Sequence, residues 1–290
     1  MLIDGATGTE CERRGVPQLD GAWNGGAALS HPDVVREVHG DYIAAGAQVI
    51  IANTFATHRH SLKTAGVAAD FVAYNQRAVE LAVEARVAAG ADAVVVAGGI
   101  SNWTWSGAHP SLEVLRRNTA EQAATMRDGG ADLLMLEMMI DIDRMRATLD
   151  GAVTSGLPVW VGLTCGSEEG EPFSDDGTVR LRDGEPLEEA ITALDAYDVG
   201  AITIMHTVVD MIDDCLDVAL DGWPGIVAVY AHSGDYVDGK WIFQGVISPS
   251  EYEAHAQRWF DQGVRAIEGC CGIGPDHIQR LGSLGPDRRS

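Results

Sequence analysis

The sequence predicts a single (β/α)8 TIM barrel, an α/β fold in which each of eight parallel strands is followed by a helix. Short β-branched apolar runs alternate with longer helical patterns along the chain, which is typical of βα units and a parallel sheet. Eight such units fit within the 290 residues, a normal length for one barrel. A closed barrel has no edge strands, so the count favours it over an open doubly wound sheet.

The eight expected strands are near-continuous hydrophobic runs because a parallel strand is buried on both faces. In chain order they cover residues 2–5, 48–53, 93–98, 133–137, 159–164, 201–205, 226–230 and 265–269. Helices fill the stretches between them, and the residues at 30–33 and 248–251 resemble capping boxes at helix starts. After the second start, Tyr252, Ala256 and Trp259 are spaced for one buried helical face.

Two segments fall outside this repeat. Residues 166–186 are rich in Gly, Glu and Asp and form the one long irregular stretch. We predict that they are a βα loop over the active face of the barrel. Since no shift in composition marks a second domain, we expect one barrel domain at 1–284 and a frayed tail at 285–290.

The charge balance excludes two classes of partner. Lys and Arg number 20 against 43 Asp and Glu, a formal net charge of −23, which repels nucleic-acid phosphates and anionic lipid surfaces. The sequence shows no secretory signal, and no apolar run reaches the roughly 18 residues of a membrane helix. Five Cys, two of them adjacent, suit a reducing compartment better than a disulfide framework. We therefore expect a cytoplasmic protein with no nucleic-acid or membrane partner, and the sequence leaves a homo-oligomer open.

Polar residues gather where the predicted strands end. In a barrel of this kind, functional groups lie just past the carboxyl ends of the strands. At these ends the sequence has Asp4 and Gly5, Asn53 and Thr54, Ser101 and Asn102, Glu137, Thr164 and Cys165, His206 and Thr207, His232 and Ser233, and Cys270 and Cys271. The clustering predicts a functional site at this end of the barrel without defining its chemistry.

The adjacent Cys270 and Cys271 have three ordinary interpretations: buried small hydrophobic side chains, a vicinal redox pair, or two metal ligands. The flanking Gly269 and Gly272 let the backbone turn sharply, so both sulfurs can face one point. With His206 at the end of a nearby strand, the set becomes Cys2His, which leaves one open position on tetrahedral zinc, as catalytic sites require. A single strand-end His is more often a hydrogen-bonded structural residue, so the zinc prediction depends on the coincidence of all three positions.

Several motifs follow one another along nearly the whole chain. Residues 4–10 read DG-x-x-GTE, 39–47 are similar to H-x-x-Y-x-x-AGA, 53–55 to NT-aromatic, 136–137 to a strand-four Glu, 230–234 to VYPNSG, and 269–272 with 275–278 to GGCC…PEHI. Together they resemble the homocysteine S-methyltransferase family, which includes betaine- and S-methylmethionine-using enzymes. Several separate motifs in the right order are far more specific than any one of them.

The resemblance implies roles for the matching residues. Cys270 and Cys271 would be zinc thiolates; Asp4, Gly5 and Glu137 would contact the ammonium and carboxylate ends of an amino-acid acceptor; Asn53 and Thr54 would line the same pocket. A carboxylate beside an ammonium group forms charge-assisted hydrogen bonds, which agrees with this assignment. Asp4 has an alternative as a turn-stabilising residue, whereas an unpaired buried carboxylate at Glu137 would be costly.

Three positions depart from the family pattern. His206 stands where the third zinc Cys is expected, and His232 replaces the Asn of the VYPNSG-like run. The segment after the third strand carries Trp103 and Trp105, which either receive an onium donor through cation–π contacts or cover the base of a loop. Zinc binding survives these changes, while the donor and the acceptor stay open.

The function that we predict is a zinc-dependent transfer of a methyl group from a small onium donor, S-methylmethionine or betaine-like, to a zinc-bound thiol. Homocysteine, which would give methionine, is the acceptor that the resemblance implies. A zinc-dependent hydrolase on the same barrel is one alternative, with His232 as its water-activating base. A barrel that binds a thiol or an amino acid without catalysis is the other.

Overall fold

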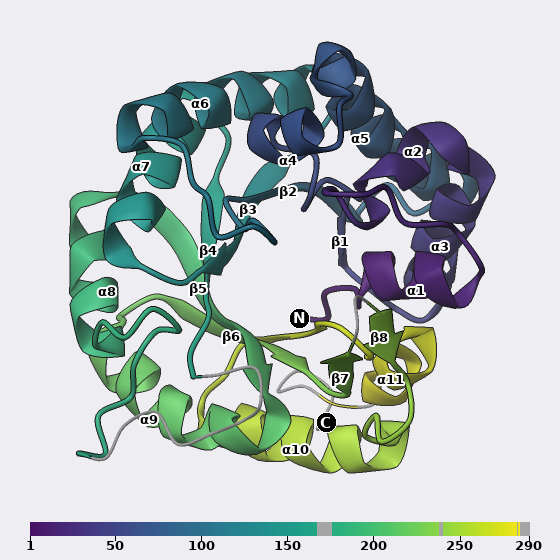
Figure 1. The fold of residues 1–290 in the computed structure, drawn as a ribbon. Helices are drawn as coiled ribbons and strands as arrows, with labels where there is room; N and C mark the ends of the chain where they lie inside the picture. Colours follow the sequence, from purple (N-terminus) through teal and green to yellow (C-terminus); the bar gives the residue numbers. More distant parts are fainter. Residues whose placement is uncertain (167–175, 238–239, 283, 285–290) are drawn as a thin grey trace.

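The computed structural model describes residues 1–166, 176–237, 240–282 and 284. These residues form an α/β fold around one parallel seven-stranded sheet, in the order β1-β2-β3-β4-β5-β6-β9. The sheet curls, and Figure 1 shows the helices arranged around its outside. Its strands are β1 (Val49–Ile51), β2 (Val95–Ser101), β3 (Leu133–Met139), β4 (Val159–Leu163), β5 (Val199–Val208), β6 (Ile226–His232) and β9 (Ala266–Gly269). Each overlaps one of the strands predicted from 48–53 onward.

The first predicted strand, at residues 2–5, is reduced to two isolated bridges. Leu2 pairs with Ile267 of β9, and Ile3 pairs with Val49 of β1, both in parallel. The amide of Ile3 donates to the Ile267 carbonyl at 2.9 Å, and the amide of Asp4 donates to the Val49 carbonyl at 3.0 Å. The segment is short because the chain turns into helix α1 at Thr7. The two edge strands of the seven-stranded sheet are therefore joined through residues 2–4.

The helices of the described residues pack on the sheet or on one another. They are α1 (Thr7–Arg13), α2 (Ala27–Ser30), α3 (Pro32–Ala44), α4 (Arg59–Thr64), α5 (Phe71–Ala88), α6 (Leu112–Asp128), α7 (Ile142–Ala152), α8 (Leu187–Ala193), α9 (Ile212–Gly222), α10 (Pro249–Gln262) and α11 (Pro275–Leu281). None of these helices is long and apolar enough to cross a bilayer.

The two predicted capping boxes have different outcomes. Ser248 and Glu251 form a complete box at the start of α10, each side chain accepting from the other's backbone amide. The box predicted at 30–33 is wrong: Ser30 is the last residue of α2, and its hydroxyl donates to the Gly26 carbonyl at 3.0 Å. That hydroxyl is therefore not used as a cap, and α3 begins after His31 without a side-chain cap.

Buried apolar side chains lie on both faces of the sheet. The outer layer, between sheet and helices, contains Tyr252 and Trp259 of α10, both fully buried, as the helical spacing predicts. The inner layer, enclosed by the curled sheet, contains Met135, Tyr230 and Cys270. Because side chains alternate along a strand, the polar strand ends stand directly above this inner layer.

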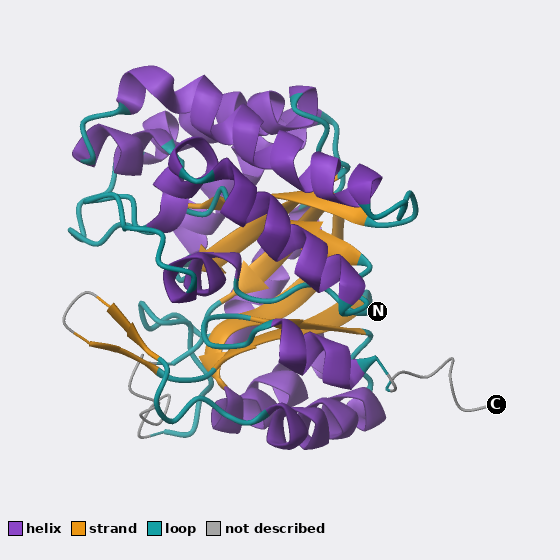
Figure 2. Cartoon of the chain, turned by 90° about the vertical axis from the view of Figure 1, so that its right-hand side faces the viewer, coloured by secondary structure: helices purple, strands orange, loops and turns teal. Residues whose placement is uncertain are grey.

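An antiparallel hairpin, β7 (Asp235–Val237) with β8 (Lys240–Ile242), follows β6 and was not predicted. Figure 2 shows it at the end of the molecule where the strand arrowheads and loops gather. Of the loop predicted at 166–186, residues 167–175 lie outside the described residues. In the described part, Leu181 forms an isolated antiparallel bridge with Cys165, and Arg180 forms another with Pro186. The tail expected at 285–290 also lies outside them.

Candidate functional site

The two adjacent cysteines sit on a tight turn after β9. The amide of Cys270 donates to the Ala231 carbonyl at 2.8 Å, and the amide of Ser233 donates to the Cys271 carbonyl at 3.0 Å. Gly272 has a φ of +84°, and a Cβ there would lie 2.1 Å from the Ser233 carbonyl oxygen. Only glycine fits such a left-handed, crowded position. The end of β6 and the residue that follows it thus hold the backbone of both cysteines from one side.

His206 reaches the same place through a bulge in β5. The register of β5 with β6 shifts between Met205 and Val208, and His206 has a φ of +45°, rare for a residue with a Cβ. A bulge turns a side chain that strict alternation would place on the other face. As a result Met205 and His206, which are consecutive, both line the same cavity.

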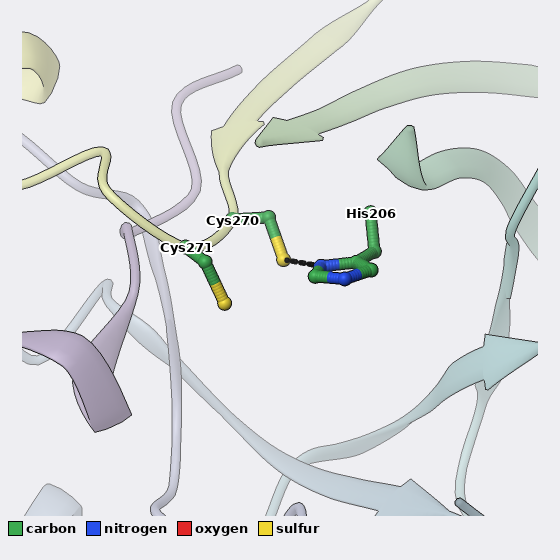
Figure 3. A group of neighbouring side chains, drawn as sticks. All are labelled: His206, Cys270 and Cys271. Atoms are coloured by element: carbon green, nitrogen blue, oxygen red, sulfur yellow. Dashed lines mark hydrogen bonds between the residues drawn. The ribbon is translucent and has the colours of Figure 1, made fainter. Parts of the chain in front are cut away.

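Together these elements bring three potential ligand atoms into one group. The Nδ1 or Nε2 atoms of His206 and the Sγ atoms of Cys270 and Cys271 all lie within 4.8 Å of one another, and His206 Nδ1 lies 3.2 Å from Cys270 Sγ. Figure 3 shows the three side chains pointing toward one another. His206 lies two residues before the end of β5, and Cys270 and Cys271 directly follow β9.

The electrostatics of this group fit a metal ion. Burial, with a hydrogen bond to Cys271, raises the pKa of the Cys270 thiol well above its usual range. Burial, with His232 and Arg182 nearby, lowers the pKa of His206 well below its usual range. The imidazole is therefore neutral, which is the ligand form, while the Cys270 thiol needs a nearby cation to ionise. Two sulfurs and one imidazole are donors that soft divalent metals take.

A second bulge, on β3, directly follows Glu137, whose side chain faces the cavity by alternation with Leu133 and Met135 of the inner layer. The register of β3 with β4 shifts between Leu136 and Met139, and Met138 has a φ of +54°. The Glu137 side chain packs against Gly99, where a Cβ would lie 2.2 Å from Oε2. The Tyr230 hydroxyl donates to Glu137 Oε1 at 3.1 Å, while Oε2 has no hydrogen-bond partner among the described residues.

Two more buried carboxyl groups surround Glu137. Asp4 accepts from the Ile51 amide at 2.8 Å through Oδ2, and Glu268 on β9 is fully buried. Burial raises the pKa of Glu137 to about 8, only partly opposed by the Tyr230 hydroxyl. Burial, and then the charges of the neighbouring carboxyl groups, also raise the pKa of Glu268. Such a cluster is stable when neutral or when a cation is bound to it.

One cavity of about 520 Å³ contains both polar ends, within the range of about 300–1,000 Å³ for small-molecule sites. Its wall is rich in aromatic side chains: Trp23, Phe55, Trp103, Trp105 and Trp241. Trp105 is 39% exposed, which places it at the mouth rather than in the floor. The cavity therefore combines an apolar wall with two separate polar ends.

Nearly all of the predicted site residues meet in this cavity. It is lined by Gly5, Asn53, Thr54, Trp103, Glu137, His206, His232, Cys270 and Cys271. Asp4 differs, because it is fully buried and is not among the lining residues. Asn53 donates to the Asn24 carbonyl at 2.9 Å, and Thr54 donates to the Gly99 carbonyl at 2.7 Å, so both side chains are held by the walls of the cavity.

Two residues near the site were missed by sequence reasoning. Trp241 of β8 packs with its ring centroid 6.4 Å from that of His206, and the Asp-Gly pair before Lys240 is a hairpin signal that was not used. Glu268 lies on β9, two residues after Ala266 of the inner layer. Because alternate residues along a strand share a face, this spacing places the Glu268 side chain on the inner face.

The group of two thiols and one imidazole is a possible metal site at the carboxyl ends of a parallel sheet, and comparison with known proteins gives the class of this α/β protein. Residues 1–284 match the sequence profile of the family described as homocysteine S-methyltransferase. Homocysteine S-methyltransferase of Escherichia coli (strain K12) is 27% identical, with 97% of this chain and 94% of that protein covered. Homocysteine S-methyltransferase 1 of Arabidopsis thaliana is 24% identical, with coverages of 97% and 91%.

A solved structure agrees with these sequence matches. The metallated form of the homocysteine methyltransferase MmuM from Escherichia coli superposes with a TM-score of 0.80 at 25% identity, covering 98% of this chain and 95% of that one. The chain belongs to the homocysteine S-methyltransferase family. The family resemblance of the sequence motifs is thereby confirmed.

Proposed function

We propose that the protein transfers a methyl group from a small onium donor to the thiol of homocysteine, with zinc held by His206, Cys270 and Cys271. The observation that carries the proposal is that the three ligand atoms lie within 4.8 Å of one another in the same cavity as the buried carboxyl group of Glu137. A group of two thiols and one imidazole leaves one open position on zinc. The thiol of the acceptor would take that position.

The carboxyl end of the cavity suits the ammonium group of the acceptor. Glu137 Oε2 is buried and has no hydrogen-bond partner among the described residues, so an ammonium group there forms a charge-assisted hydrogen bond. Asp4 stands behind Glu137 as a second carboxyl group, and Gly5, Asn53 and Thr54 form the adjoining wall. Homocysteine carries the thiol and the ammonium group on one small molecule, so it can occupy both ends at once.

The protein contributes positioning and exclusion of water to an in-line displacement. His206, Cys270 and Cys271 would hold the zinc, which would supply the lowered pKa of a coordinated thiol and so a nucleophilic thiolate at neutral pH. The new S–C bond forms as the bond from the donor's sulfur or nitrogen to its methyl group breaks, and the electron pair stays on the departing donor. The thiol proton passes to solvent. Alignment of the two reactants contributes several kcal/mol to such a step.

The donor end is assigned to the aromatic wall. Trp103 lines the cavity with Trp105, and an aromatic face attracts a sulfonium or quaternary ammonium group by roughly 0.5–2 kcal/mol per ring. A small onium donor such as S-methylmethionine or a betaine-like compound suits this wall.

The architecture that we propose for residues 1–284 is one closed (β/α)8 barrel domain. The support is that residues 2–4 pair with both edge strands of the seven-stranded sheet, as an eighth strand would. In such barrels catalytic groups lie at the carboxyl ends of the strands. The His206, Cys270 and Cys271 group, Glu137 and His232 all occupy that end.

The test is methyl transfer by zinc-loaded protein across a matrix of donors and thiols. S-methylmethionine and glycine betaine are each combined with homocysteine, cysteine and mercaptoethanol, and the methylated product is quantified. We expect the highest turnover with homocysteine and an onium donor. Ester hydrolysis without methyl transfer would favour the zinc-dependent hydrolase with His232 as its base. Homocysteine binding without any turnover would favour the non-catalytic barrel.

A further inference from the structure

The two histidines that depart from the family motifs lie face to face. The rings of His206 on β5 and His232 on β6 are stacked, with centroids 4.4 Å apart and planes 27° apart. They are far apart in sequence, and each stands where the family pattern has another residue, Cys or Asn. Because the two histidines contact each other, we treat them as one structural unit.

His206 needs support from its surroundings. Its backbone φ of +45° is unfavourable for a residue with a Cβ, and such conformations persist only where neighbouring structure holds them. The bulge in β5 that permits this conformation lies opposite His232, which pairs with Val208. The residue that faces the bulge is therefore the one whose ring covers the His206 ring.

His232 is itself held in place. Its ring meets the ring of Trp241 edge to face, with centroids 6.0 Å apart, and it is 3% exposed. Burial and the charge of Arg182 lower its pKa to about 4, and a hydrogen bond with the His206 backbone opposes this shift. His232 therefore stands between the hairpin and the bulge, in contact with both.

The same geometry argues against a direct ligand role for His232. The group of potential ligand atoms that lie within 4.8 Å of one another contains His206, Cys270 and Cys271 but not His232. A ring stacked on the His206 imidazole, with planes 27° apart, supports the orientation of that side chain. Partners that orient metal ligands typically contribute about 10–100-fold to metal affinity.

We propose that His232 is a positioning residue whose ring, backed by Trp241, holds His206 in its left-handed bulge so that the imidazole faces Cys270 and Cys271. The inference rests on the proposed function, because it assumes that these three residues bind the metal. His206 and His232 thus form one unit in this chain. A Cys at position 206 has no ring to be covered, so it would not depend on His232.

The test measures Co²⁺ and Zn²⁺ affinity by chelator competition, without turnover. His232→Ala should weaken affinity about 10–100-fold, and His232→Phe, which keeps a flat ring, should weaken it less than about tenfold. At saturation, His232→Ala should still bind one Co²⁺ per chain with the wild-type thiolate charge-transfer and d–d bands. His255→Ala, on α10 and outside the ligand group, is the matched control and should leave affinity unchanged.

A double-mutant cycle separates positioning from a general effect on folding. In the His206→Cys background, His232→Ala should change metal affinity by less than about threefold, because coupling needs both rings. A residue that merely stabilises the fold would lower affinity equally in both backgrounds, which would overturn the proposal. The metal-free melting temperature of each variant shows whether it folds, and His232→Phe keeps the test open if His232→Ala does not.

Three results would overturn the inference. They are wild-type affinity in His232→Ala, a Co²⁺ spectrum of His232→Ala that has lost a ligand, or equal effects in the two backgrounds. Cys270→Ser in the same assay distinguishes failure of the proposed metal site from failure of the positioning role of His232. If Cys270→Ser also binds metal like wild type, the metal lies elsewhere and the proposed function fails; if only the His232 variants do so, the inference alone is wrong.

Discussion

The cavity has two buried polar ends that differ in the cation they require. At the sulfur end, burial keeps the Cys270 thiol and the His206 imidazole neutral. At the carboxyl end, burial raises the pKa of Glu137 to about 8, beside Asp4 and Glu268. Both ends are costly to ionise without a partner. Thiolate and imidazole ligands favour a soft metal ion, whereas carboxylates favour a hydrogen-bonding ammonium group.

This difference explains why one small molecule can satisfy the whole site. In the function that we propose, an amino-acid thiol brings its sulfur to one end and its ammonium group to the other, and the two groups could not exchange places. Each bulged strand serves one end: β3 presents Glu137, and β5 presents His206. The comparison makes the two ends separable by mutation, because a change at one should leave the chemistry of the other in place.

The largest expected effect is loss of the metal from the sulfur end. We expect the double variant Cys270→Ser, Cys271→Ser to fall from about one zinc per chain to less than about a tenth, since both thiolate donors are removed. Elemental analysis of the purified protein measures it. Cys215→Ser, at a buried Cys on α9 outside the ligand group, is the control. Unchanged zinc in the double variant would show that the ligand assignment is wrong.

The next effect concerns His206. His206→Ala should lower zinc affinity by more than about tenfold because one of three protein ligands is lost. His206→Cys should keep zinc and make the ligand set one unit more negative. The apparent pKa of the bound acceptor thiol should then rise, seen in the pH dependence of kcat/KM, and weaker onium donors should become usable. Normal affinity in His206→Ala with loss in His232→Ala would mean that His232 is the ligand.

A smaller effect is expected at the aromatic wall. Trp103→Ala should raise the KM for the onium donor by roughly 2–30-fold, the equivalent of about 0.5–2 kcal/mol for one cation–π contact. Trp103→Phe should raise the KM for the donor less, because it keeps an aromatic face. Steady-state kinetics with varied donor and saturating homocysteine measure this. If both variants have the wild-type KM for the donor, Trp103 is only a hydrophobic cover.

The smallest effect is a pH-dependent change in stability at the carboxyl end. Since the pKa of Glu137 is raised from its usual 4.5 to about 8, the folded protein keeps a proton that the unfolded chain releases between these values. The free energy of unfolding therefore falls as pH rises through that window. Glu137→Gln removes this loss and should raise the Tm of the ligand-free protein by about 3 °C or more at pH 8. The gain should be smaller at pH 5, and equal gains at both pH values would contradict the pKa shift.

The strands of the fold could be predicted because their signal is local. An apolar run such as residues 159–164 identifies a buried parallel strand without knowledge of its neighbours, and β4 follows it. The first strand was overestimated because its pairing depends on where β1 and β9 meet it, which only the folded sheet decides. The β7–β8 hairpin was missed because its short strands follow directly on β6.

The placement of a residue in the site could be predicted where its position along the sequence alone decides it. Cys270, Cys271 and Glu137 stand at strand ends, so the rule for parallel sheets brings them together. The left-handed bulges at Met138 and His206 could not be predicted, because a register shift depends on packing between strands. The same holds for the stacking of His206 on His232, which joins residues from two strands. Sequence reasoning identified both histidines but not their contact.

The most direct test of the account asks whether the carboxyl end reads the ammonium group. Wild-type and Glu137→Gln protein, both zinc-loaded, are compared by the ratio of kcat/KM for homocysteine to that for desamino-homocysteine. A hydrogen bond to a charged group contributes about 1.5–3 kcal/mol, so wild type should prefer homocysteine roughly 10–100-fold. Glu137→Gln should lose most of this preference while its zinc content stays unchanged. If the variant kept the wild-type ratio, Glu137 would not bind the ammonium group, and the two-ended account of the cavity would be wrong.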